Sequence, residues 1–230
     1  MARSENIFKH RVGILGGTFD PVHFGHLLIA EKIRERFGLD KIYFIPAYQP
    51  PHKTRFPVAD SYDRFTMLAL ATLSNRFFNV LSLELKKRDM SYTIDTLKAL
   101  RKQNKREDYF FILGTDSFLE ITTWKEYRNL VRRCHLIVVN REGYDFARAK
   151  TSLPESLQKM VVHVENENRS FSKELEQRIK GRRKFIFYMY MDPVAISSSE
   201  IRVKMKNQES ARYDMPDSVL AYIQKNKLYL

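Results

Sequence analysis

The sequence predicts an α/β fold built on a doubly wound, mostly parallel sheet. Short apolar segments alternate with helix-like segments up to residue 140. A glycine pair directly follows the first apolar segment, and no internal repeat or Pro/Gly/Ser-rich linker interrupts the chain. Strands that alternate with helices form βαβ units, and the strands of such units pair in parallel.

The chain length sets the expected domain organisation. Its 230 residues are enough for one large domain with a sizeable buried core. We expect a single domain over residues 1–230, with 142–183 as a candidate insertion and 196–230 as a C-terminal helical part. Segment 142–183 has the least regular pattern, and no function is assigned to it.

Strands are expected where short apolar runs are bounded by glycine, proline or polar residues. In chain order these runs are 12–15, 41–46, 79–85, 109–113, 135–139, 161–164 and 185–191. Helices are expected where apolar residues recur three or four positions apart with charged residues between them. These segments are 25–37, 60–73, 93–102, 124–133, 172–180, 198–205 and 217–225, with Asp60 or Ser61 as an N-cap and Gly38 and Gly181 as stop signals.

Composition narrows the class of protein. Lys and Arg number 40 against 27 Asp and Glu, and the resulting net charge of +13 favours anionic partners such as nucleotides and phosphates. No apolar run approaches the ~20 residues that span a bilayer, and segment 1–11 is too polar for a signal peptide. A single cysteine, Cys134, excludes an internal disulfide framework and a CxxC motif. We therefore expect a cytoplasmic protein with no membrane partner.

The string GGTFDPVHFGHL at 16–27 is the most informative motif. It follows a predicted strand and opens a predicted helix, where ligands of open α/β sheets bind. Paired glycines allow close approach of a phosphate, and the helix start offers N–H groups to an anion. His23 and His26 are three residues apart, so both can face that anion. The spacing is neither GxGxxG, GxxxxGK[ST] nor HExxH, and the alternative is a plain turn with structural histidines.

A second motif, ISSSEIR at 196–202, allows two interpretations. Ser197 and Glu200 fit a capping box, which is an ordinary helix start. Alternatively, the serine hydroxyls and free N–H groups bind the outer phosphates of a nucleotide, with Arg202 as a forked cation. The first motif favours this phosphate site, and the two interpretations are compatible.

Isolated polar residues after other strands are weaker signals. Asp116, two residues after Gly114, is placed either to accept hydrogen bonds from ribose hydroxyls or to cap the next helix. Lys53 and Arg141 follow strands and either contact phosphates or lie at the surface. The scattered basic clusters lack a nucleic-acid motif and are interpreted as solvated faces, so no nucleic-acid partner is expected.

Taken together, the motifs resemble those of the HxGH nucleotidyltransferase superfamily, and in particular the bacterial nicotinate-nucleotide adenylyltransferases. The matching strings, in the family's order, are GGTFDPVHFGHL at 16–27, PPHK at 50–53, SYTIDTL at 91–97, GTD at 114–116 followed by Trp124, and ISSSEIR at 196–202. Ser199 stands where the family usually has Thr, a change that keeps the hydroxyl. The resemblance runs from about Val12 to the C-terminus.

The resemblance implies a Rossmann-like nucleotidyltransferase fold and adenylyl transfer from ATP to nicotinate mononucleotide in NAD biosynthesis. It implies catalytic roles for His23, His26 and Arg202. The implied ATP-binding residues are Gly16, Gly17, Thr18, Phe19, His23, His26, Gly114, Asp116, Arg141, Ile196, Ser198, Ser199 and Arg202. The implied residues for the mononucleotide are Lys53, Tyr92, Thr93 and Trp124. Mg²⁺ would be carried by ATP rather than by a protein metal site, and a homo-oligomer is left open.

Two other functions compete with this one. The first is transfer to another acceptor: the amide mononucleotide, pantetheine phosphate or another phosphate. Tyr92, Thr93 and the Trp124 segment argue against it. The second is a non-catalytic RNA-binding protein on the same fold, which the intact His23 and His26 argue against, together with Ser199 and Arg202.

Overall fold

The computed structural model describes residues 10–49, 58–141, 143–151, 153–164, 173–179, 181, 183–192 and 194–229. Its strands are β1 (His10–Gly17), β2 (Lys41–Pro46), β3 (Phe78–Val80), β4 (Glu107–Gly114), β5 (His135–Val139), β6 (Val161–Val164) and β7 (Ile186–Met189). They form one seven-stranded sheet in the order β3-β2-β1-β4-β5-β7-β6. Parallel pairing joins β2 to β3, β1 to β4, β4 to β5, and β7 to both β5 and β6. The predicted α/β fold with a parallel sheet is confirmed.

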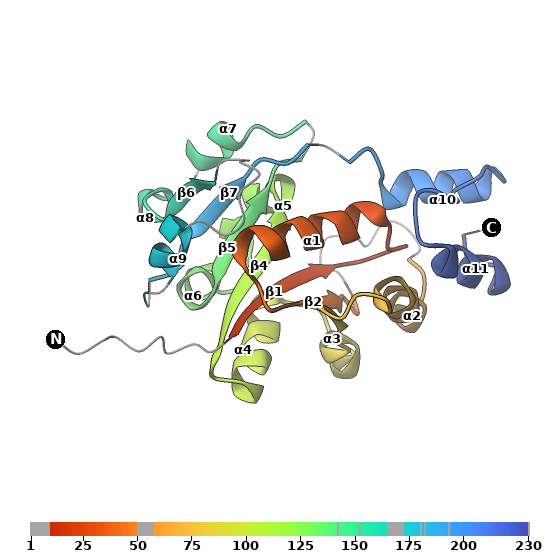
Figure 1. The fold of residues 1–230 in the computed structure, drawn as a ribbon, viewed down its shortest axis with the longest axis horizontal. Coiled ribbons are helices and arrows are strands. Elements are labelled where there is room, and N and C mark those ends of the chain that lie inside the picture. Colours follow the sequence, from red (N-terminus) through yellow and green to blue (C-terminus); the bar gives the residue numbers. More distant parts are fainter. Residues whose placement is uncertain are drawn as a thin grey trace. The chain divides into compact units, whose positions relative to one another are not determined.

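Helices connect the strands. They are α1 (Phe24–Phe37), α2 (Ser61–Thr72), α3 (Leu83–Lys87), α4 (Thr93–Gln103), α5 (Thr115–Leu119), a 3₁₀ turn η1 (Ile121–Thr123), α6 (Tyr127–Arg133), α7 (Phe146–Thr151), α8 (Glu155–Gln158), α9 (Lys173–Ile179), α10 (Ser198–Lys206) and α11 (Asp217–Lys225). Figure 1 shows them along the chain. In the described part of the chain, no helix combines the length and apolarity needed to cross a membrane.

The chain divides into two compact units. The first unit comprises Met1–Leu15, Arg34–Asp40 and Tyr92–Pro193, and the second comprises Gly16–Ile33, Lys41–Ser91 and Val194–Leu230. Each unit is assembled from three separate stretches, and the boundaries cut through both β1 and α1. The expectation of a single domain over 1–230 stays a prediction.

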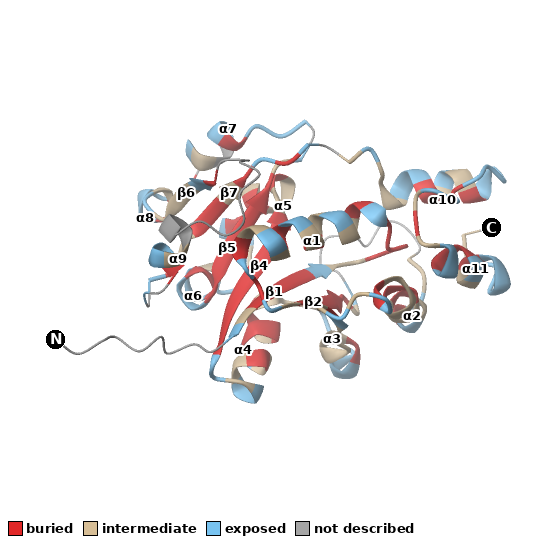
Figure 2. Cartoon of the chain, viewed as in Figure 1, coloured by how far each residue is buried: buried red, intermediate tan, exposed pale blue. Residues whose placement is uncertain are grey.

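The core of the first unit is formed by strands that carry long apolar runs, 109–113 in β4 and 136–139 in β5. Within this unit β4, β5, β7 and β6 lie side by side, and the first three are almost continuously buried (Figure 2). Phe37 of α1 contacts Phe110 of β4 and Phe187 of β7, with ring centroids 6.2 and 5.2 Å apart. Parallel strands buried on both faces have this uninterrupted apolar sequence, which is why 109–113 and 135–139 were predictable.

A buried charged cluster lies where β4 and β5 begin and just before β7. Lys184 Nζ donates a hydrogen bond to Asp108 Oδ1, and His135 Nε2 lies 3.5 Å from Asp108 Oδ2. His135 Nδ1 accepts from the Phe185 N–H at 3.2 Å, so a neutral ring carries its proton on Nε2, facing Asp108. Burial lowers the pKa values of His135 and Lys184. Beside them, the free thiol of Cys134 is 1% exposed.

The second unit packs helices against strand β2 and the edge strand β3. Phe44 of β2 contacts Phe78 of β3 edge to face, with ring centroids 5.0 Å apart. Helix α2 is capped by Asp60, whose carboxylate accepts from the Tyr62 N–H at 2.8 Å. The sequence predicts either Asp60 or Ser61 as this N-cap. Helix α11 packs on α2, and the Tyr222 hydroxyl donates to Asp63 at 2.7 Å.

The predicted strand 79–85 is correct at 79–80 and wrong beyond it. Strand β3 ends at Val80, and the next residues form the short helix α3, in which Leu85 is buried. Ser82 occupies the N-cap, and Arg88 ends the helix in the left-handed region at φ 50°. Leucines at alternating positions suit a strand, but a single helical turn can also bury one of them, and periodicity cannot separate the two over so few residues.

Smaller differences concern short helices. The predicted helix 124–133 begins only at Tyr127, because Trp124 closes the 3₁₀ turn η1. Helices α5, α7 and α8 were not predicted, and none exceeds six residues. The candidate insertion 142–183 contains α7, α8 and α9 together with β6, which matches the predicted strand 161–164.

Replacing His135 by Gln should flatten the acid side of the stability profile. Because burial lowers the pKa of His135 in the fold, the unfolded chain binds a proton below pH ~6.5 that the folded protein does not bind. The stability linked to this histidine is therefore complete above pH ~6.5. It decreases as the pH falls, by up to ~1.4 kcal/mol per pH unit.

Urea unfolding of the parent and of His135→Gln between about pH 7.5 and 5 measures the two slopes. The exposed His10→Gln variant is the matched control and should keep the parent slope. Identical slopes for the parent and His135→Gln would contradict this assignment.

Candidate phosphate loop and nucleotide site

The loop between β1 and α1 places two histidines against each other in the second unit. His26 and Leu27 donate their backbone N–H groups to the His23 carbonyl at 3.0 and 3.4 Å, so α1 starts at this point. The ring centroids of His23 and His26 are 3.8 Å apart, and the backbone N–H of His23 donates to His26 Nδ1 at 3.3 Å. His23 is buried and His26 half-buried. The predicted juxtaposition of the two histidines at a helix start is present.

Gly25 leaves the space that the His23 ring fills. A Cβ atom at Gly25 would lie 2.9 Å from His23 Nδ1 and 3.0 Å from its Cε1. Both distances are shorter than ordinary contacts, so any other residue here would displace the ring. The glycine of the HxGH pattern therefore has a steric role in placing His23.

The loop backbone is strained at Phe19. This residue has φ 52°, in the left-handed region that residues other than glycine rarely adopt. Its side chain is 2% exposed and contacts His26 edge-on at 5.0 Å and Phe44 at 6.0 Å. Packing of the aromatic ring thus holds a conformation of the kind that concentrates at functional loops.

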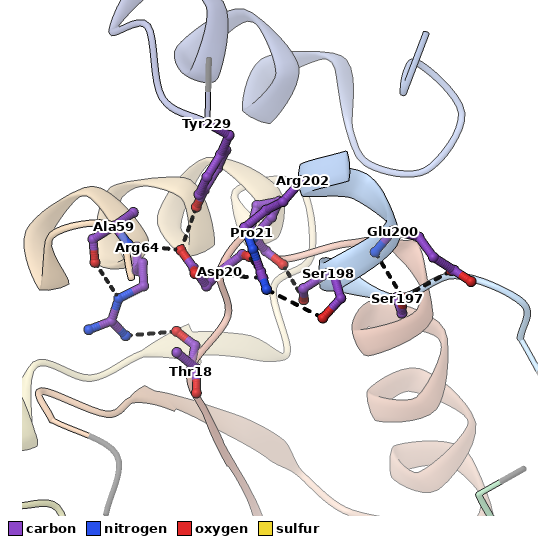
Figure 3. Close-up of polar contacts among 11 residues, drawn as sticks. Thr18, Asp20, Pro21, Ala59, Arg64, Ser197, Ser198, Glu200, Arg202 and Tyr229 are labelled. Atoms are coloured by element: carbon purple, nitrogen blue, oxygen red, sulfur yellow. Dashed lines mark hydrogen bonds and ion pairs between the residues drawn. The ribbon is translucent and has the colours of Figure 1, made fainter. Parts of the chain in front are cut away.

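The start of α10 is docked on the same loop. The Ser198 hydroxyl donates to the Pro21 carbonyl at 2.9 Å, and Arg202 Nη1 donates to the Asp20 carbonyl at 2.7 Å (Figure 3). The other guanidinium nitrogen, Nη2, donates to Ser199 Oγ at 3.3 Å. The structure therefore brings the two predicted motifs together within the second unit, although more than 170 residues separate them in sequence.

The capping box of α10 is also real. The Glu200 N–H donates to Ser197 Oγ at 3.2 Å, and the Ser197 hydroxyl donates to the Glu200 carboxylate at 2.9 Å. Ser197 caps the helix, so the capping interpretation of ISSSEIR holds. Ser198 and Arg202 contact the loop, and their role in phosphate binding stays a prediction. Ile196 is half-buried just before the cap, and Ser199 is exposed.

Asp20 joins these parts, and sequence reasoning did not single it out. Its side chain is 4% exposed, and Oδ1 accepts from the Tyr229 hydroxyl at 2.7 Å and from the Ala59 N–H at 3.1 Å. Its Oδ2 lies 3.6 Å from Arg202 Nη1. The only sequence signal was an acidic residue within a loop motif otherwise interpreted for phosphate binding.

Arg64 is the second residue that sequence reasoning missed. This α2 side chain is 1% exposed and donates to the backbone carbonyls of Thr18 at 2.7 Å and Ala59 at 2.9 Å (Figure 3). It also donates to a third carbonyl, that of Tyr48, at 3.2 Å. Burial lowers the pKa of Arg64, and the Asp20 charge opposes that shift. An arginine within an amphipathic helix pattern resembles a surface residue until its buried acceptors are known.

In the first unit, the end of β4 presents Asp116. The Thr115 hydroxyl donates to the Val139 carbonyl at 2.9 Å, which ties the ends of β4 and β5 together. Asp116 Oδ2 accepts from Arg141 Nη1 at 2.9 Å, while Oδ1 is buried and has no hydrogen-bond partner among the described residues. A Cβ at Gly114 would collide with Oδ1. Gly114, not Asp116, is the N-cap of α5, so the helix-cap alternative does not hold.

The remaining predicted residues of the first unit lie around α4 and η1. Tyr92 is the N-cap of α4, Thr93 is its first residue, and Trp124 contacts Phe111 edge-on at 6.0 Å. Lys125 lies over the Tyr92 ring at 4.6 Å. It also forms an ion pair with Asp95 at 2.9 Å, so the residue after Trp124 contacts the start of α4. Sequence reasoning missed both members of this pair. Lys53 and the rest of segment 50–53 lie outside the described residues.

A family model and several known proteins are similar to this chain over most of its length. A cytidylyltransferase-like family model matches residues 14–204. The chain is 39% identical over 220 residues to a "probable nicotinate-nucleotide adenylyltransferase" of Moorella thermoacetica, covering 95% of this chain and 91% of that protein. It is 37% identical over 220 residues to a protein of the same name from Thermoanaerobacter sp., covering 95% and 94%.

The structural comparison agrees on the fold. A solved Plasmodium falciparum nicotinic acid mononucleotide adenylyltransferase complexed with NaAD superposes with a TM-score of 0.66 at 18% identity, covering 96% of this chain and 97% of that one. At this identity, the likeness supports the Rossmann-like nucleotidyltransferase fold.

Replacing Arg64 by Met should lower the free energy of unfolding by about 3 kcal/mol or more. The three carbonyl oxygens would lose their donor, and each unsatisfied buried group costs ~1–3 kcal/mol. Arg64→Lys should recover part of the loss, since an ammonium cannot reach three acceptors in a fixed fork. Urea denaturation measures both changes. The exposed Arg212→Met should change stability by less than ~0.5 kcal/mol, and an equally small effect at Arg64 would disprove the role.

Proposed function

This chain belongs to the cytidylyltransferase-like family and, within it, to the nicotinate-nucleotide adenylyltransferases, and we propose that it performs their reaction. ATP and nicotinate mononucleotide would give nicotinate adenine dinucleotide and pyrophosphate, a step of NAD biosynthesis. The observation that carries this proposal is the docking of Ser198 and Arg202 on the loop that holds His23 and His26. Hydroxyl, guanidinium and imidazole donors on one loop suit a polyphosphate.

The reaction needs positioning and charge neutralisation rather than a general base. The attacking oxygen belongs to a phosphate monoester, whose second pKa is about 6, so it is mostly ionised at neutral pH. The difficulty is to bring this anion onto the α-phosphate of ATP, as in phosphoryl transfer generally. Preorganised donors aimed at the developing charge lower that barrier.

The second unit would supply those donors. His23 and His26 would contact the triphosphate, with His26 nearest the reacting phosphate. Ser198, Ser199 and Arg202 would hold the departing pyrophosphate, together with the N–H groups at the start of α10. Gly16 to Phe19 would let the loop backbone approach the nucleotide, with Ile196 beside the cap of α10.

The first unit would supply groups for the sugar and the pyridine ring. The buried, unpartnered Oδ1 of Asp116 beside Gly114 suits a ribose hydroxyl, which would complete its hydrogen bonding. Arg141 would contact phosphate, as would Lys53. Tyr92, Thr93 and Trp124 would hold the nicotinate, with the aromatic ring of Trp124 offering a stacking surface.

Mg²⁺ would arrive with ATP. The described residues contain no group of three His, Cys, Asp or Glu side chains that could hold a metal ion, and Asp20 Oδ1 is already occupied by two donors. Mg²⁺ prefers oxygen ligands and retains several waters, so phosphate oxygens of ATP and water would be its main ligands. Bound in this way, the ion would neutralise phosphate charge.

Four further expectations from the sequence stay predictions: cytoplasmic location, no nucleic-acid partner, no membrane partner, and an open oligomeric state. A competing acceptor is tested by a panel containing the amide mononucleotide, pantetheine phosphate and nicotinate mononucleotide. A non-catalytic RNA-binding protein would bind RNA and release no pyrophosphate. The deciding assay is ATP-dependent pyrophosphate release with nicotinate mononucleotide, and no release would refute the proposal.

Replacing His26 by Ala should lower kcat by ~10²–10³ without unfolding the protein, because loss of one preorganised donor to a charged transition state costs that much. Steady-state kinetics and a thermal melt measure the two effects. His10→Ala, at an exposed histidine before the loop, should leave both unchanged. Near-parental turnover in His26→Ala would remove His26 from the mechanism.

The enzyme should prefer nicotinate mononucleotide over its amide by at least tenfold in kcat/KM. The two substrates have nearly the same shape, but the amide NH₂ is a donor where the carboxylate has an acceptor. Opposite the N–H groups at the start of α4, this mismatch leaves polar groups unpaired at ~1–3 kcal/mol. Trp124→Ala should weaken both substrates and change their ratio less. Equal kcat/KM values for acid and amide would defeat this account.

A further inference from the structure

The last described residue of the chain returns to the phosphate loop. Tyr229 donates its hydroxyl to Asp20 Oδ1 at 2.7 Å, across 209 positions of sequence (Figure 3). Both residues belong to the second unit, which also contains α10 and α11. Burial, followed by the charge of Asp20 and the hydrogen bond to it, raises the pKa of Tyr229, so the phenol stays protonated and remains a donor.

The position of Tyr229 is set by the end of α11. The Leu228 N–H donates to the Ile223 carbonyl at 3.0 Å, which closes the chain back on the helix. Ile223 is fully buried, and α11 packs on α2. Tyr229 itself has φ 64°, so its backbone is held in the left-handed region. The hydroxyl is therefore presented to Asp20 by a packed helix end.

Asp20 is the link between Tyr229 and Arg202. The Asp20 carboxylate takes Tyr229 and the Ala59 N–H on Oδ1, and its Oδ2 faces Arg202 Nη1 at 3.6 Å. The same Nη1 donates to the Asp20 carbonyl at 2.7 Å. If the Tyr229 hydroxyl is lost, Oδ1 keeps one donor, and the carboxylate can rotate toward the guanidinium. The N–H groups of Arg202 would then donate to Asp20 instead of to a phosphate.

We propose that Tyr229 is a positioning residue that acts through Asp20 to keep the Arg202 guanidinium available for the outer phosphates of the nucleotide. This inference rests on the proposed function, which assigns those phosphates to Arg202. It identifies the segment after α11 as part of the phosphate site, without any contact between Tyr229 and substrate.

The test compares two tyrosine variants that each remove one hydroxyl. Tyr229→Phe should weaken ATP binding and raise the KM for ATP by about tenfold, as expected when a hydrogen bond to a charged group is lost. The KM for nicotinate mononucleotide should stay within about twofold. Tyr222→Phe is the matched control, because it removes a hydroxyl bond of the same length, to Asp63 at 2.7 Å, from the same part of the chain. Tyr222→Phe should keep the parental ATP parameters.

Two readouts separate this inference from the proposed function. Pyrophosphate release by the parent enzyme tests the function. Calorimetric titration of each variant with ATP tests the role of Tyr229 even if the parent proves inactive toward the mononucleotide. Weaker ATP binding in Tyr229→Phe alone, with a melting temperature like that of Tyr222→Phe, supports the role. Unchanged ATP binding in Tyr229→Phe, or an equal loss in both variants, overturns it.

Discussion

The buried carboxylate of Asp20 is the interaction on which the phosphate loop depends. This side chain, 4% exposed, contacts the Ala59 N–H just before α2, Arg202 of α10 and Tyr229 after α11. A charge in such a place is costly unless it is paired and hydrogen-bonded, so the contacts are mutually required. Segments from the N-terminal and C-terminal parts of the second unit are thereby held together around a few loop residues.

Two glycines solve the same steric problem in the two units. Gly25 leaves room for the His23 ring, and Gly114 leaves room for the Asp116 carboxylate. In each case a polar side chain folds back over the backbone of a residue two positions away. A polar group held against the main chain has few alternative rotamers, and this restriction keeps it in place before a ligand arrives.

The sequence predicted what depends on local pattern and missed what depends on distant partners. Strands β2, β5 and β6 and helix α11 were placed at their observed bounds, because apolar runs and turn signals are local. The C-terminal part of predicted strand 79–85 was wrong because a few alternating leucines suit two structures. Asp20 and Arg64 were missed for another reason. Their importance lies in acceptors and donors far along the chain, and a surface arginine and a buried one have the same local sequence.

The burial of Cys134 sets the thiol reactivity of the folded chain. It is the single cysteine, it lies beside the Lys184 cluster, and burial raises the pKa of its thiol to about 12. The thiolate is the reactive form, so at neutral pH this buried side chain is unreactive toward alkylating reagents and in disulfide exchange. The folded protein therefore behaves as a cysteine-free background, in which one cysteine engineered at the surface would be the sole site for a fluorophore or spin label.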